Sequence, residues 1–368
     1  MKSCLSLVAT LVFCLSLAGC SLGAQHLPSE ANGKTRPSRS GVGGSAAPLA
    51  IASIHMVDEK TGWAMSADGR VLRTTDGGQT WIDVTPSQVG NRPPSIVGGL
   101  GAFAGASKAW YLDVETYVVY GSSDGGHSWE RLAAIKPDII ADGGVVLTFA
   151  DSRHGWIEVM SGAHHSRGEI FTTADGGRTW TQVYAGGLAG DLRFKDAGHG
   201  WLSTGAALYR TEDGGKTWNK VNLPGGAPSW VGLPLPLGSK LILLAVEEGS
   251  NRPQLTIFAS DSTGGSWEVL FTHEVRSIST ATSFAVDGLH AWVATTDGSL
   301  GVRTKDAGRH WESFSTPEGF NVRELDFVSP NVGWMVAQDR KSYDYALFQT
   351  DDGGQTWIKV SPVLSTSP

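Results

Sequence analysis

An eight-residue unit recurs along most of the chain and constrains its fold more than any other feature. The clear copies read TTDGGQTW at 74–81, SSDGGHSW at 122–129, TADGGRTW at 173–180, TEDGGKTW at 211–218 and TDDGGQTW at 350–357. Two degenerate copies, SDSTGGSW at 260–267 and TKDAGRHW at 304–311, bring the count to seven. Such a repeat indicates an array of supersecondary units that bury their apolar faces against one another.

A Gly-Trp or Ala-Trp pair precedes most copies of the unit and forms a second anchor. Its tryptophans are Trp63, Trp110, Trp156, Trp201, Trp292 and Trp334, and only the fifth repeat lacks one. Successive aspartate positions of the unit lie between 38 residues (Asp175 to Asp213) and 51 residues (Asp124 to Asp175) apart. This spacing suits a four-stranded blade with variable loops, so the sequence predicts an all-β, seven-bladed β-propeller with four-stranded antiparallel blades.

The first repeat shows the expected blade most clearly. Its apolar runs predict strands at 51–57, 63–66, 70–75 and 81–85, with a hairpin turn at Asp68-Gly69. The 48 glycines and 14 tryptophans of the chain fit many short strands and tight turns, and leave no place for long helices. Seven complete repeats fill 51–361 without a split blade, so blades one and seven are expected to pack edge to edge.

Each position of the eight-residue unit has a role in folding. The aspartate can accept hydrogen bonds from N–H groups of its own turn, and the glycines permit positive φ. The final tryptophan can bury a large apolar surface between blades. We therefore interpret these residues as structural: Asp76, Asp124, Asp175, Asp213, Asp306 and Asp352, with Trp81, Trp129, Trp180, Trp218, Trp267, Trp311 and Trp357. Ser262 stands where the fifth unit would have its aspartate.

These units resemble the Asp-box, or BNR, repeat of sialidases, sortilin-type receptors, some xyloglucan hydrolases and the photosystem II stability and assembly factors. The likeness covers 51–361. It is strongest to the assembly factors and their non-photosynthetic relatives, which also join a Gly-Trp strand to a terminal DGGxTW in one exported propeller. The resemblance implies a non-catalytic role in binding or assembling proteins at a membrane.

The first twenty residues resemble the signal of a bacterial lipoprotein. Lys2 is followed by the apolar run 5–17, which is shorter than a membrane-spanning helix, and Leu17-Ala18-Gly19-Cys20 matches a lipobox. That resemblance implies cleavage before Cys20 and lipid attachment to its sulfur. The chain would then be extracytoplasmic and anchored to the bacterial cell membrane or outer membrane, and residues 21–48, rich in Gly, Ser and Pro, would be a flexible tether.

Four segments follow from these features. They are the signal peptide (1–19), the lipidated cysteine and flexible linker (20–48), the propeller (49–362) and a C-terminal tail (363–368). All three cysteines lie within the first twenty residues, so the propeller has no disulfide and no thiolate nucleophile. The formal net charge of -7 disfavours a nucleic-acid partner.

One face of the expected propeller carries the long loops. Inter-blade connections and the loops between second and third strands share this face, which we call the loop face. The long stretches 87–96, 135–143, 161–168, 247–253 and 338–345 all fall on it. Because loops on a rigid scaffold commonly bind partners, we expect the site there. Its candidate residues are Arg92, His164, His165, Arg167, Arg252, Arg276, Arg323, Arg340, Lys341, Tyr343 and Tyr345.

The loop face is expected to be basic and aromatic on an otherwise acidic chain. Arg276 and Arg323 are expected to begin the innermost strands of blades six and seven, near the mouth of the central channel, as is Asp191 in blade four. Such a cluster suggests an acidic peptide or a membrane-protein loop as partner, although ordinary solvated loop charges give the same pattern. The adjacent His164 and His165 lack a third ligand, so no metal or cofactor is predicted.

Two classes of function are consistent with the sequence. The first is a non-catalytic protein-binding or assembly scaffold that meets an exported or membrane protein. The alternative is a carbohydrate-binding protein or a hydrolase of the sialidase or glycoside hydrolase kind. Sialidases with this repeat carry an Arg-Ile-Pro motif, which does not occur here, and the xyloglucan hydrolases pair two propellers around two carboxylates. Trp230 lies outside both anchors, so it is the tryptophan that we consider as a candidate for stacking on a sugar.

Overall fold

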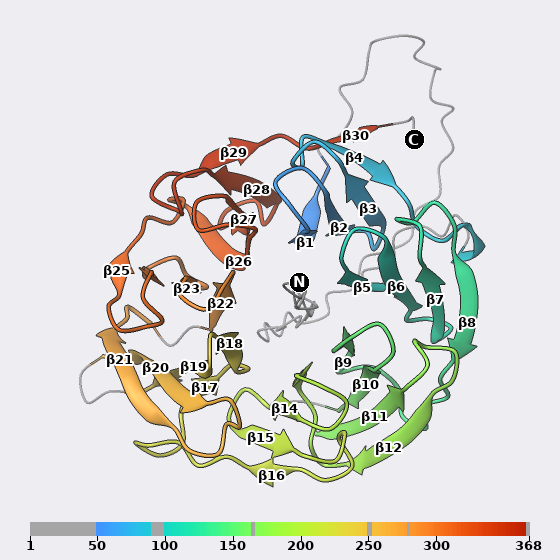
Figure 1. Cartoon of the computed structure of the whole chain (residues 1–368), viewed down its shortest axis with the longest axis horizontal. Coiled ribbons are helices and arrows are strands. Elements are labelled where there is room, and N and C mark those ends of the chain that lie inside the picture. Colours follow the sequence, from blue (N-terminus) through green and yellow to red (C-terminus); the bar gives the residue numbers. More distant parts are fainter. Residues whose placement is uncertain (1–48, 90–98, 163–165, 249–251, 278–279, 366–368) are drawn as a thin grey trace, which may run out of the picture.

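The computed structural model describes residues 49–89, 99–162, 166–248, 252–277 and 280–365. Seven antiparallel sheets follow one another around a ring (Figure 1), which confirms the predicted seven-bladed β-propeller with four-stranded blades. In these ranges the only helical turn is η1 (Ser87–Val89), and no helix is long and apolar enough to cross a membrane. Cys20, the signal sequence and the linker lie outside the described residues.

Every blade is a meander that runs from an innermost strand to an outermost one. Blade 1 has β1 (Ile51–Met56), β2 (Gly62–Ser66), β3 (Val71–Thr74) and β4 (Thr80–Asp83). Blade 2 has β5 (Leu100–Ala104), β6 (Lys108–Asp113), β7 (Val118–Ser122) and β8 (Glu130–Ala134). Blade 3 has β9 (Gly144–Phe149), β10 (Gly155–Ser161), β11 (Arg167–Thr173) and β12 (Thr181–Gly186). Blade 4 has β13 (Asp191–Phe194), β14 (Gly200–Ser203), β15 (Leu208–Thr211) and β16 (Asn219–Lys220).

The remaining three blades continue the ring, and blade 5 departs from the common plan. Its innermost strand is split into β17 (Trp230–Val231) and β18 (Leu235–Leu237), which both pair with β19 (Lys240–Glu247); β20 (Gln254–Asp261) and β21 (Glu268–Glu274) follow. Pro234 stands in the break and Pro236 inside β18, at a channel edge where no ladder bond is needed. Blade 6 has β22 (Ala281–Ala285), β23 (Ala291–Thr295), β24 (Gly301–Thr304) and β25 (Glu312–Ser313). Blade 7 has β26 (Phe320–Phe327), β27 (Gly333–Asp339), β28 (Tyr345–Thr350) and β29 (Ile358–Val360).

Burial along a blade follows its radial position. All six residues of β1 and all five of β2 are buried, because both faces of these inner strands pack on neighbouring blades. The outermost strands are largely exposed, and both residues of β16 and of β25 face solvent. The apolar runs of the sequence therefore mark the inner strands, and the polar positions after each unit mark the rim.

The hydrophobic core is divided into clusters that lie between blades. Seven clusters of buried side chains occur in the described residues, and each joins two adjacent blades. The cluster between blades 7 and 1 contains Ile54 and Trp81 from one side and Trp334 and Val336 from the other. The ring is thus closed by the same kind of packing that joins its other members.

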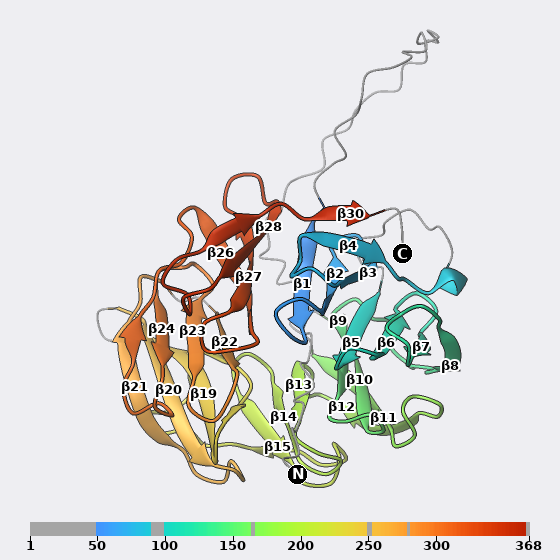
Figure 2. The same cartoon turned by 45° about the horizontal axis from the view of Figure 1, so that its top comes forward.

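Ring closure also uses a strand that the sequence does not announce. The lack of a split blade predicts edge-to-edge packing alone, but Val363–Ser365 form β30, which pairs in parallel with β4 of blade 1. Val363 N donates to the carbonyl oxygen of Gln79 at 3.1 Å. The chain therefore crosses from blade 7 to the outer rim of blade 1 and adds a fifth strand there (Figures 1 and 2).

Candidate binding face

The two faces of the ring differ in the turns that they carry. Because the strands of a blade are antiparallel, the eight-residue units between third and fourth strands share a face with the turns between first and second strands; we call this the unit face. The loop face carries the other connections. Figure 2 shows the ring tilted, so that the thickness of the blades between the two faces can be seen.

The aspartate of each intact unit is held by its own turn, as the second unit illustrates. Asp124 Oδ1 accepts from the Ser122 hydroxyl and the Ser128 N–H, each at 2.9 Å, and its Oδ2 accepts from the Ser128 hydroxyl at 2.5 Å. These bonds from Ser128 lower the pKa of Asp124 to about 2. Gly125 and Gly126 have φ of 80° and 88°, which a side chain would strain.

The same carboxylate bonds recur in the other intact units. In four of these units the aspartate accepts a hydroxyl bond and an N–H bond from the threonine at position seven; these aspartates are Asp76, Asp175, Asp213 and Asp352. Position seven of the sixth unit is His310, whose N–H and imidazole Nδ1 contact Asp306 in the same way. Both oxygens of each carboxylate are engaged inside the turn.

In most blades, the tryptophan of the Gly-Trp or Ala-Trp anchor links the blade to the next one. Trp110 Nε1 of blade 2 donates to the carbonyl oxygen of Gly176 in the unit of blade 3 at 2.9 Å. The equivalent bonds run from Trp156 to Gly214, from Trp292 to Gly353 and from Trp334 to Gly77. Trp63 differs, because it donates to Gly105 in the first turn of blade 2. The two sequence anchors are thus the two ends of an inter-blade hydrogen bond.

The link is missing where the fifth unit is degenerate. Trp201 of blade 4 is buried, but its Nε1 has no hydrogen-bond partner among the described residues. Ser262 replaces the expected aspartate, and Asp261 accepts from the Thr263 hydroxyl and N–H instead. The tryptophan of this unit, Trp267, is still 93% buried, since only 7% of it is exposed.

The final tryptophans of the units lie toward the rim. Trp81 is fully buried and donates to Gly78 in its own unit, whereas Trp129 and Trp357 are half-buried and donate to the preceding blade at Val84 and Ser315. The half-buried Trp180, Trp218 and Trp311 pack against clusters between blades. These tryptophans shield the seams from solvent and present no open stacking platform.

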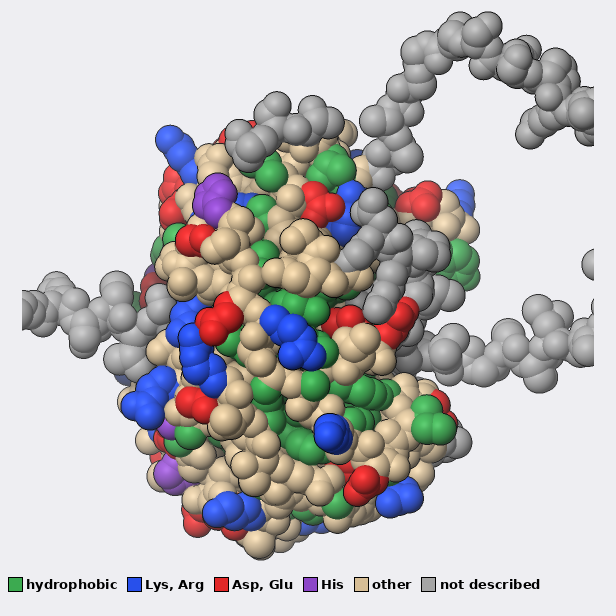
Figure 3. Space-filling view, turned by 90° about the vertical axis from the view of Figure 1, so that its right-hand side faces the viewer, with side chains coloured by type: hydrophobic (Ala, Val, Ile, Leu, Met, Phe, Trp, Pro, Cys, Tyr) green, Lys and Arg blue, Asp and Glu red, His purple; other side chains and the backbone are tan. Residues whose placement is uncertain are grey.

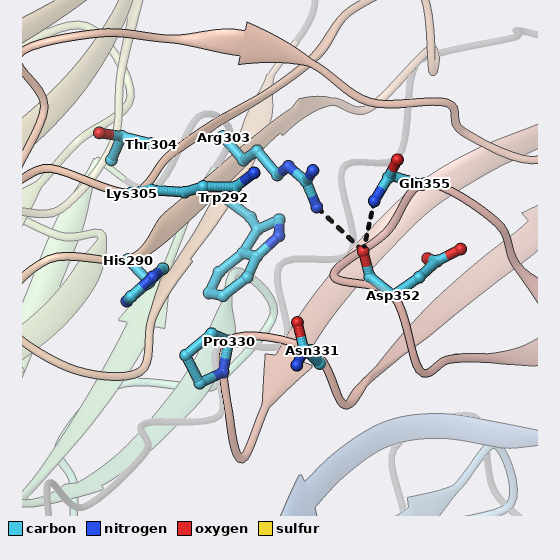
Figure 4. A pocket seen from close by; sticks show the side chains of 9 residues that line it. All are labelled: His290, Trp292, Arg303, Thr304, Lys305, Pro330, Asn331, Asp352 and Gln355. Atoms are coloured by element: carbon cyan, nitrogen blue, oxygen red, sulfur yellow. Dashed lines mark hydrogen bonds between the residues drawn. The ribbon is translucent and has the colours of Figure 1, made fainter.

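A recess of about 280 Å³ lies between blades 6 and 7 on the unit face. Figure 4 shows Trp292 below the side chains of Arg303 and Lys305, with Pro330, Asn331, Asp352 and Gln355 on the opposite side. Arg303 is fixed by Glu312 at 2.7 Å and by the carbonyl oxygens of Asp352 and Gly353. Lys305 also pairs with Glu312 at 2.7 Å, so the charges around the recess are already matched.

The structure places the candidate residues of the loop face on several blades. Arg92, His164 and His165 lie outside the described residues. Arg167 is the exposed first residue of β11 in blade 3, and Tyr345 is the half-buried first residue of β28, where it packs on the cluster between blades 7 and 1. These two are separate from the group formed by the other candidates.

Blades 5 and 7 supply that group. Val275 N donates to the carbonyl oxygen of Pro253 at 2.9 Å, so Arg252 and Arg276 lie beside each other at the loop end of the β20–β21 hairpin. Both are exposed, and no ion pair of either exists within the described residues. Arg276 is therefore on the outer connection of blade 5, two residues after β21, and the expectation that it begins the innermost strand of blade 6 is wrong, since β22 starts at Ala281.

A chain of polar contacts continues from this pair across blade 6 to blade 7. Ser277 donates to Asp297 at 2.9 Å, and the guanidinium of Arg340 donates to the carbonyl oxygen of Asp297. Arg340 Nε also donates to Asn321 Oδ1 at 3.2 Å. Arg340 thus joins the loops of blades 6 and 7, and its cationic group is partly engaged.

Arg323 and Tyr343 form the blade 7 end of the group. Arg323 is an exposed residue within β26 whose guanidinium donates to Gln338, and Gln338 donates in turn to the carbonyl oxygen of Tyr343 at 2.8 Å. Tyr343 has a positive φ of 62°, and 69% of it is exposed. We call Arg252, Arg276, Arg323, Lys341 and Tyr343 the basic sector of the loop face.

Buried ionisable groups at the junction of blades 7 and 1 were not indicated by the sequence. Glu324 accepts from the Ser53 hydroxyl at 2.6 Å and from Ile54 N at 3.2 Å, and Asp326 accepts from Met56 N at 2.5 Å. They occupy N–H groups on the free edge of β1. Burial raises the pKa of Glu324 to about 7 and that of Asp326 well above its usual range.

Two more buried groups lie on inner strands. Burial, aided by the charge of Arg73, lowers the pKa of His55 to about 4, and its Nδ1 has no partner among the described residues. Burial also raises the pKa of Glu158, whose Oε1 accepts from Gly190 N at 3.1 Å. A charged residue on an otherwise apolar inner strand would have been the sequence signal for these groups. In the described ranges, no three His, Cys, Asp or Glu residues are arranged to hold a metal ion.

On the side of the ring that carries β8, charged groups are mixed rather than segregated. Basic and acidic side chains are interspersed there, around a region where hydrophobic side chains gather (Figure 3). The exposed pair Arg178 and Glu130, at 2.7 Å, is one such matched contact. In the basic sector, by contrast, neither Arg252 nor Arg276 forms an ion pair within the described residues, although Glu247 and Glu274 flank Gln254 on the neighbouring strands.

These features define a β-propeller protein with short, internally bonded turns on one face and longer loops on the other. No protein-family model and no curated protein sequence matches the chain. Among solved structures it is similar to one described as YCF48 bound to D1 peptide, with 17% identity, a TM-score of 0.59, and coverage of 83% of this chain and 94% of the other.

Two further solved structures share the fold. YCF48 from Cyanidioschyzon merolae has 16% identity and a TM-score of 0.54, with 84% of this chain and 98% of that chain covered. The β-propeller domain of the Trilobed protease from Pyrococcus furiosus, described as having an open velcro topology, has 11% identity and a TM-score of 0.50, with 88% and 100% covered. At these identities the likeness concerns the fold.

Proposed function

We propose that this chain is a membrane-anchored, extracytoplasmic propeller that binds or assembles other proteins through its loop face and is not catalytic. The observation that carries the proposal is the basic sector, in which blade 5 contributes two neighbouring exposed arginines and blade 7 contributes an exposed arginine and an exposed tyrosine. By contrast, the aspartates of the unit face are engaged within their own turns. This contrast supports placing the contacts with a partner on the loop face.

The chemistry of the basic sector favours an acidic peptide or protein loop. Arg252 and Arg276 offer two neighbouring guanidinium groups, each able to bind a carboxylate by two parallel hydrogen bonds. Tyr343 adds a rigid aromatic surface of the kind that dominates binding energy at protein interfaces. Since the chain as a whole is acidic, a local basic sector would also orient an acidic partner as it approaches.

The similar solved structures support this class of function. YCF48 bound to D1 peptide shows that a propeller of this fold can hold a peptide. The lipoprotein-like start of the sequence, ending in Cys20, supports a position at a membrane. For this chain we infer an exported or membrane protein as the partner.

The test is capture of partners from crosslinked membranes with the full chain. One variant combines Arg252→Ala, Arg276→Ala, Arg323→Ala and Tyr343→Ala, and a matched variant changes exposed unit-face residues by Arg178→Ala, Lys216→Ala and Arg309→Ala. We expect one protein to be captured by the unchanged chain and by the unit-face variant, and its yield to fall at least tenfold with the loop-face variant. Equal capture by both variants would refute the placement on the loop face.

Carbohydrate binding is the alternative. The recess between blades 6 and 7, with Trp292, Asn331 and Gln355 in its lining, is the feature that favours it. Retention of the chain on a polysaccharide matrix that is lost in an Asn331→Ala, Gln355→Ala variant would establish this alternative. The buried carboxylates Glu158, Glu324 and Asp326 do not line that recess, so it lacks the carboxylate pair that a hydrolase requires.

The membrane anchor is tested by Cys20→Ser. Two or more acyl chains hold a protein on a membrane far more firmly than one does, so loss of the lipidated thiol should release the chain from the membrane fraction. Retention of the Cys20→Ser chain in washed membranes would contradict a lipid anchor at this residue.

A further inference from the structure

The outer edge of β4 is the one place on the rim where a sheet continues beyond its fourth strand. Among the described residues, β8, β12, β16, β21, β25 and β29 all end their sheets, whereas β4 is followed by β30. In Figure 1, β30 lies outside β4 at the top of the ring, separated from the axis by the whole of blade 1. This surface is distinct from the loop face and does not depend on its proposed function.

The contact between β30 and β4 is made through the backbone. Val363, Leu364 and Ser365 pair in parallel with Thr80, Trp81 and Ile82, in register. The Val363 N–H donates to the Gln79 carbonyl oxygen at 3.1 Å. Because backbone groups are common to every peptide, any extended segment of suitable direction and shape can make the same bonds.

The two aliphatic side chains of β30 bury little surface in this attachment. Val363 remains 55% exposed and Leu364 36% exposed although both are paired. Ile358 on β29, which leads toward this segment, is 66% exposed. The rim of blades 7 and 1 thus has three partly exposed aliphatic side chains in a short stretch, and the occupant of the β4 edge is held by few buried contacts.

We propose that the outer edge of β4 is a strand-addition site for an extended segment of another protein, and that β30 is its internal occupant. The register fixes the chemistry of the ligand: a parallel strand with aliphatic residues at two successive positions, equivalent to Val363 and Leu364, and a small polar residue after them. A long or charged residue at the second position would face the buried Trp81 across the pair. When the partner segment pairs with β4, β30 is displaced.

The experiment compares three states of the β4 edge in the full chain. Val363→Pro removes the N–H that bonds to Gln79 and frees the edge, and Val363→Ala is the matched control that keeps it. Ile82→Cys with Ser365→Cys, which face each other in the register, locks β30 in place when oxidised. The probe is a fluorescent peptide with the sequence SPVLST, that of residues 361–366, and SPPLST is the control peptide.

We expect fluorescence anisotropy to show that the Val363→Pro chain binds SPVLST about threefold more tightly than the Val363→Ala chain. The oxidised double-cysteine chain should not bind it, and reduction should restore the binding of the unchanged chain. Equal binding by the locked and reduced chains, or equal binding of SPPLST, would overturn the proposal. A change in tryptophan fluorescence would show that Val363→Pro disturbs the fold. In that case, peptide binding by the oxidised and reduced double-cysteine chains still tests the proposal.

A second copy of the chain could take the same edge by exchanging β30. Mixing chains that carry only Ile82→Cys with chains that carry only Ser365→Cys tests this directly. Disulfide-linked dimers formed at micromolar concentration would show that the edge receives β30 of another copy, and would overturn the proposal of a different partner. We expect the mixed chains to remain monomeric.

Discussion

At the scale of single residues, the aspartates of the repeated units act as internal caps of a turn. Asp213 accepts four hydrogen bonds, from the Thr211 hydroxyl, Lys216 N, Thr217 N and the Thr217 hydroxyl. The bonds reach across the glycines that reverse the chain, so one side chain ties the residues before the turn to those after it. This explains how so many tight turns are stable without a helix or a disulfide in the described propeller.

Asp213→Ala should lower the free energy of unfolding by about 1 to 3 kcal/mol, because several turn donors lose their acceptor. Urea denaturation followed by tryptophan fluorescence measures the change. The neighbouring Glu212→Ala is the control, since its exposed carboxylate pairs only with Arg210 at the surface. An equal effect of the two changes would contradict the capping role.

The inter-blade tryptophans allow a matched comparison. Trp110→Phe removes the indole N–H that bonds to Gly176, while Trp201→Phe removes an N–H that has no partner among the described residues. Trp110 also stacks on Phe149, so the difference between the two changes reports the hydrogen bond together with any loss of that stack. We expect Trp110→Phe to be the more destabilising by about 1 to 2 kcal/mol in thermal or urea unfolding. The reverse order would refute the link between anchors.

Glu324 and His55 give the molecule opposing pH dependences. Burial raises the pKa of Glu324 from its ordinary value of 4.5 to about 7. Its protonated form is the one that folding favours, so this contribution is full below about pH 4.5 and is lost as the pH rises through 7. Relative to Glu324→Gln, the unchanged chain should therefore lose on the order of 3 kcal/mol of stability between pH 5 and 8.

His55 acts in the other direction. Its pKa is lowered from 6.5 to about 4, so folding favours the neutral imidazole. The stability that the neutral form contributes is full above about pH 6.5 and is lost as the pH falls toward 4. His55→Gln should therefore gain stability over the unchanged chain on acidification. Denaturation curves of both variants from pH 5 to 8 measure the two trends, and parallel curves for variant and unchanged chain would show that the group is not held as described.

At the scale of strands and turns, a recurring contact explains the Gly-Trp pair. In blade 3, Phe149 at the end of the innermost strand stacks on Trp110 of the preceding blade with ring centroids 3.8 Å apart. A Cβ on Gly155 would approach that phenylalanine to 2.5 Å, so the residue before the next tryptophan must be small. Phe194 and Phe327 repeat the stack with Trp156 and Trp292.

The sequence predicted the strands of blade 1 to within a few residues, because its turns are marked by units and by glycine. It could not predict β30, since Val363-Leu364-Ser365 carries no turn signal and its pairing with β4 joins positions almost 300 residues apart. The split inner strand of blade 5 was also not predicted, because that blade lacks the Gly-Trp anchor. Periodicity reveals repeated local structure, whereas these features depend on the closed ring.

Release of β30 should have little effect on global stability. Ordering three residues costs roughly 1 to 2 kcal/mol each, while backbone hydrogen bonds contribute only about 0.5 to 1.5 kcal/mol each, so the two nearly offset one another. Val363→Pro should change the free energy of unfolding by less than about 1 kcal/mol. A loss above about 3 kcal/mol in urea denaturation, comparable to that of a core truncation, would show that β30 is an essential closure of the ring.

At the scale of the whole molecule, seven inter-blade clusters make a rigid ring on which two unlike faces are mounted. The sequence placed the long loops on one face from their lengths, but it could not tell which of them meet. Arg252 and Arg276 are neighbours because β20 pairs with β21, and Tyr343 joins Arg323 through Gln338. Arg340, by contrast, is partly engaged between blades, which no sequence pattern indicates.

Contact of the basic sector with a protein partner can be measured by photo-crosslinking. A photo-crosslinking amino acid is placed at Tyr343 of the full chain, in the cells that produce it, and the same amino acid at His127 on the unit face is the control. We expect one defined adduct from position 343, lost when Arg252→Ala and Arg276→Ala are added, and none from position 127. Adducts from position 127 alone, or from neither position, would contradict this contact.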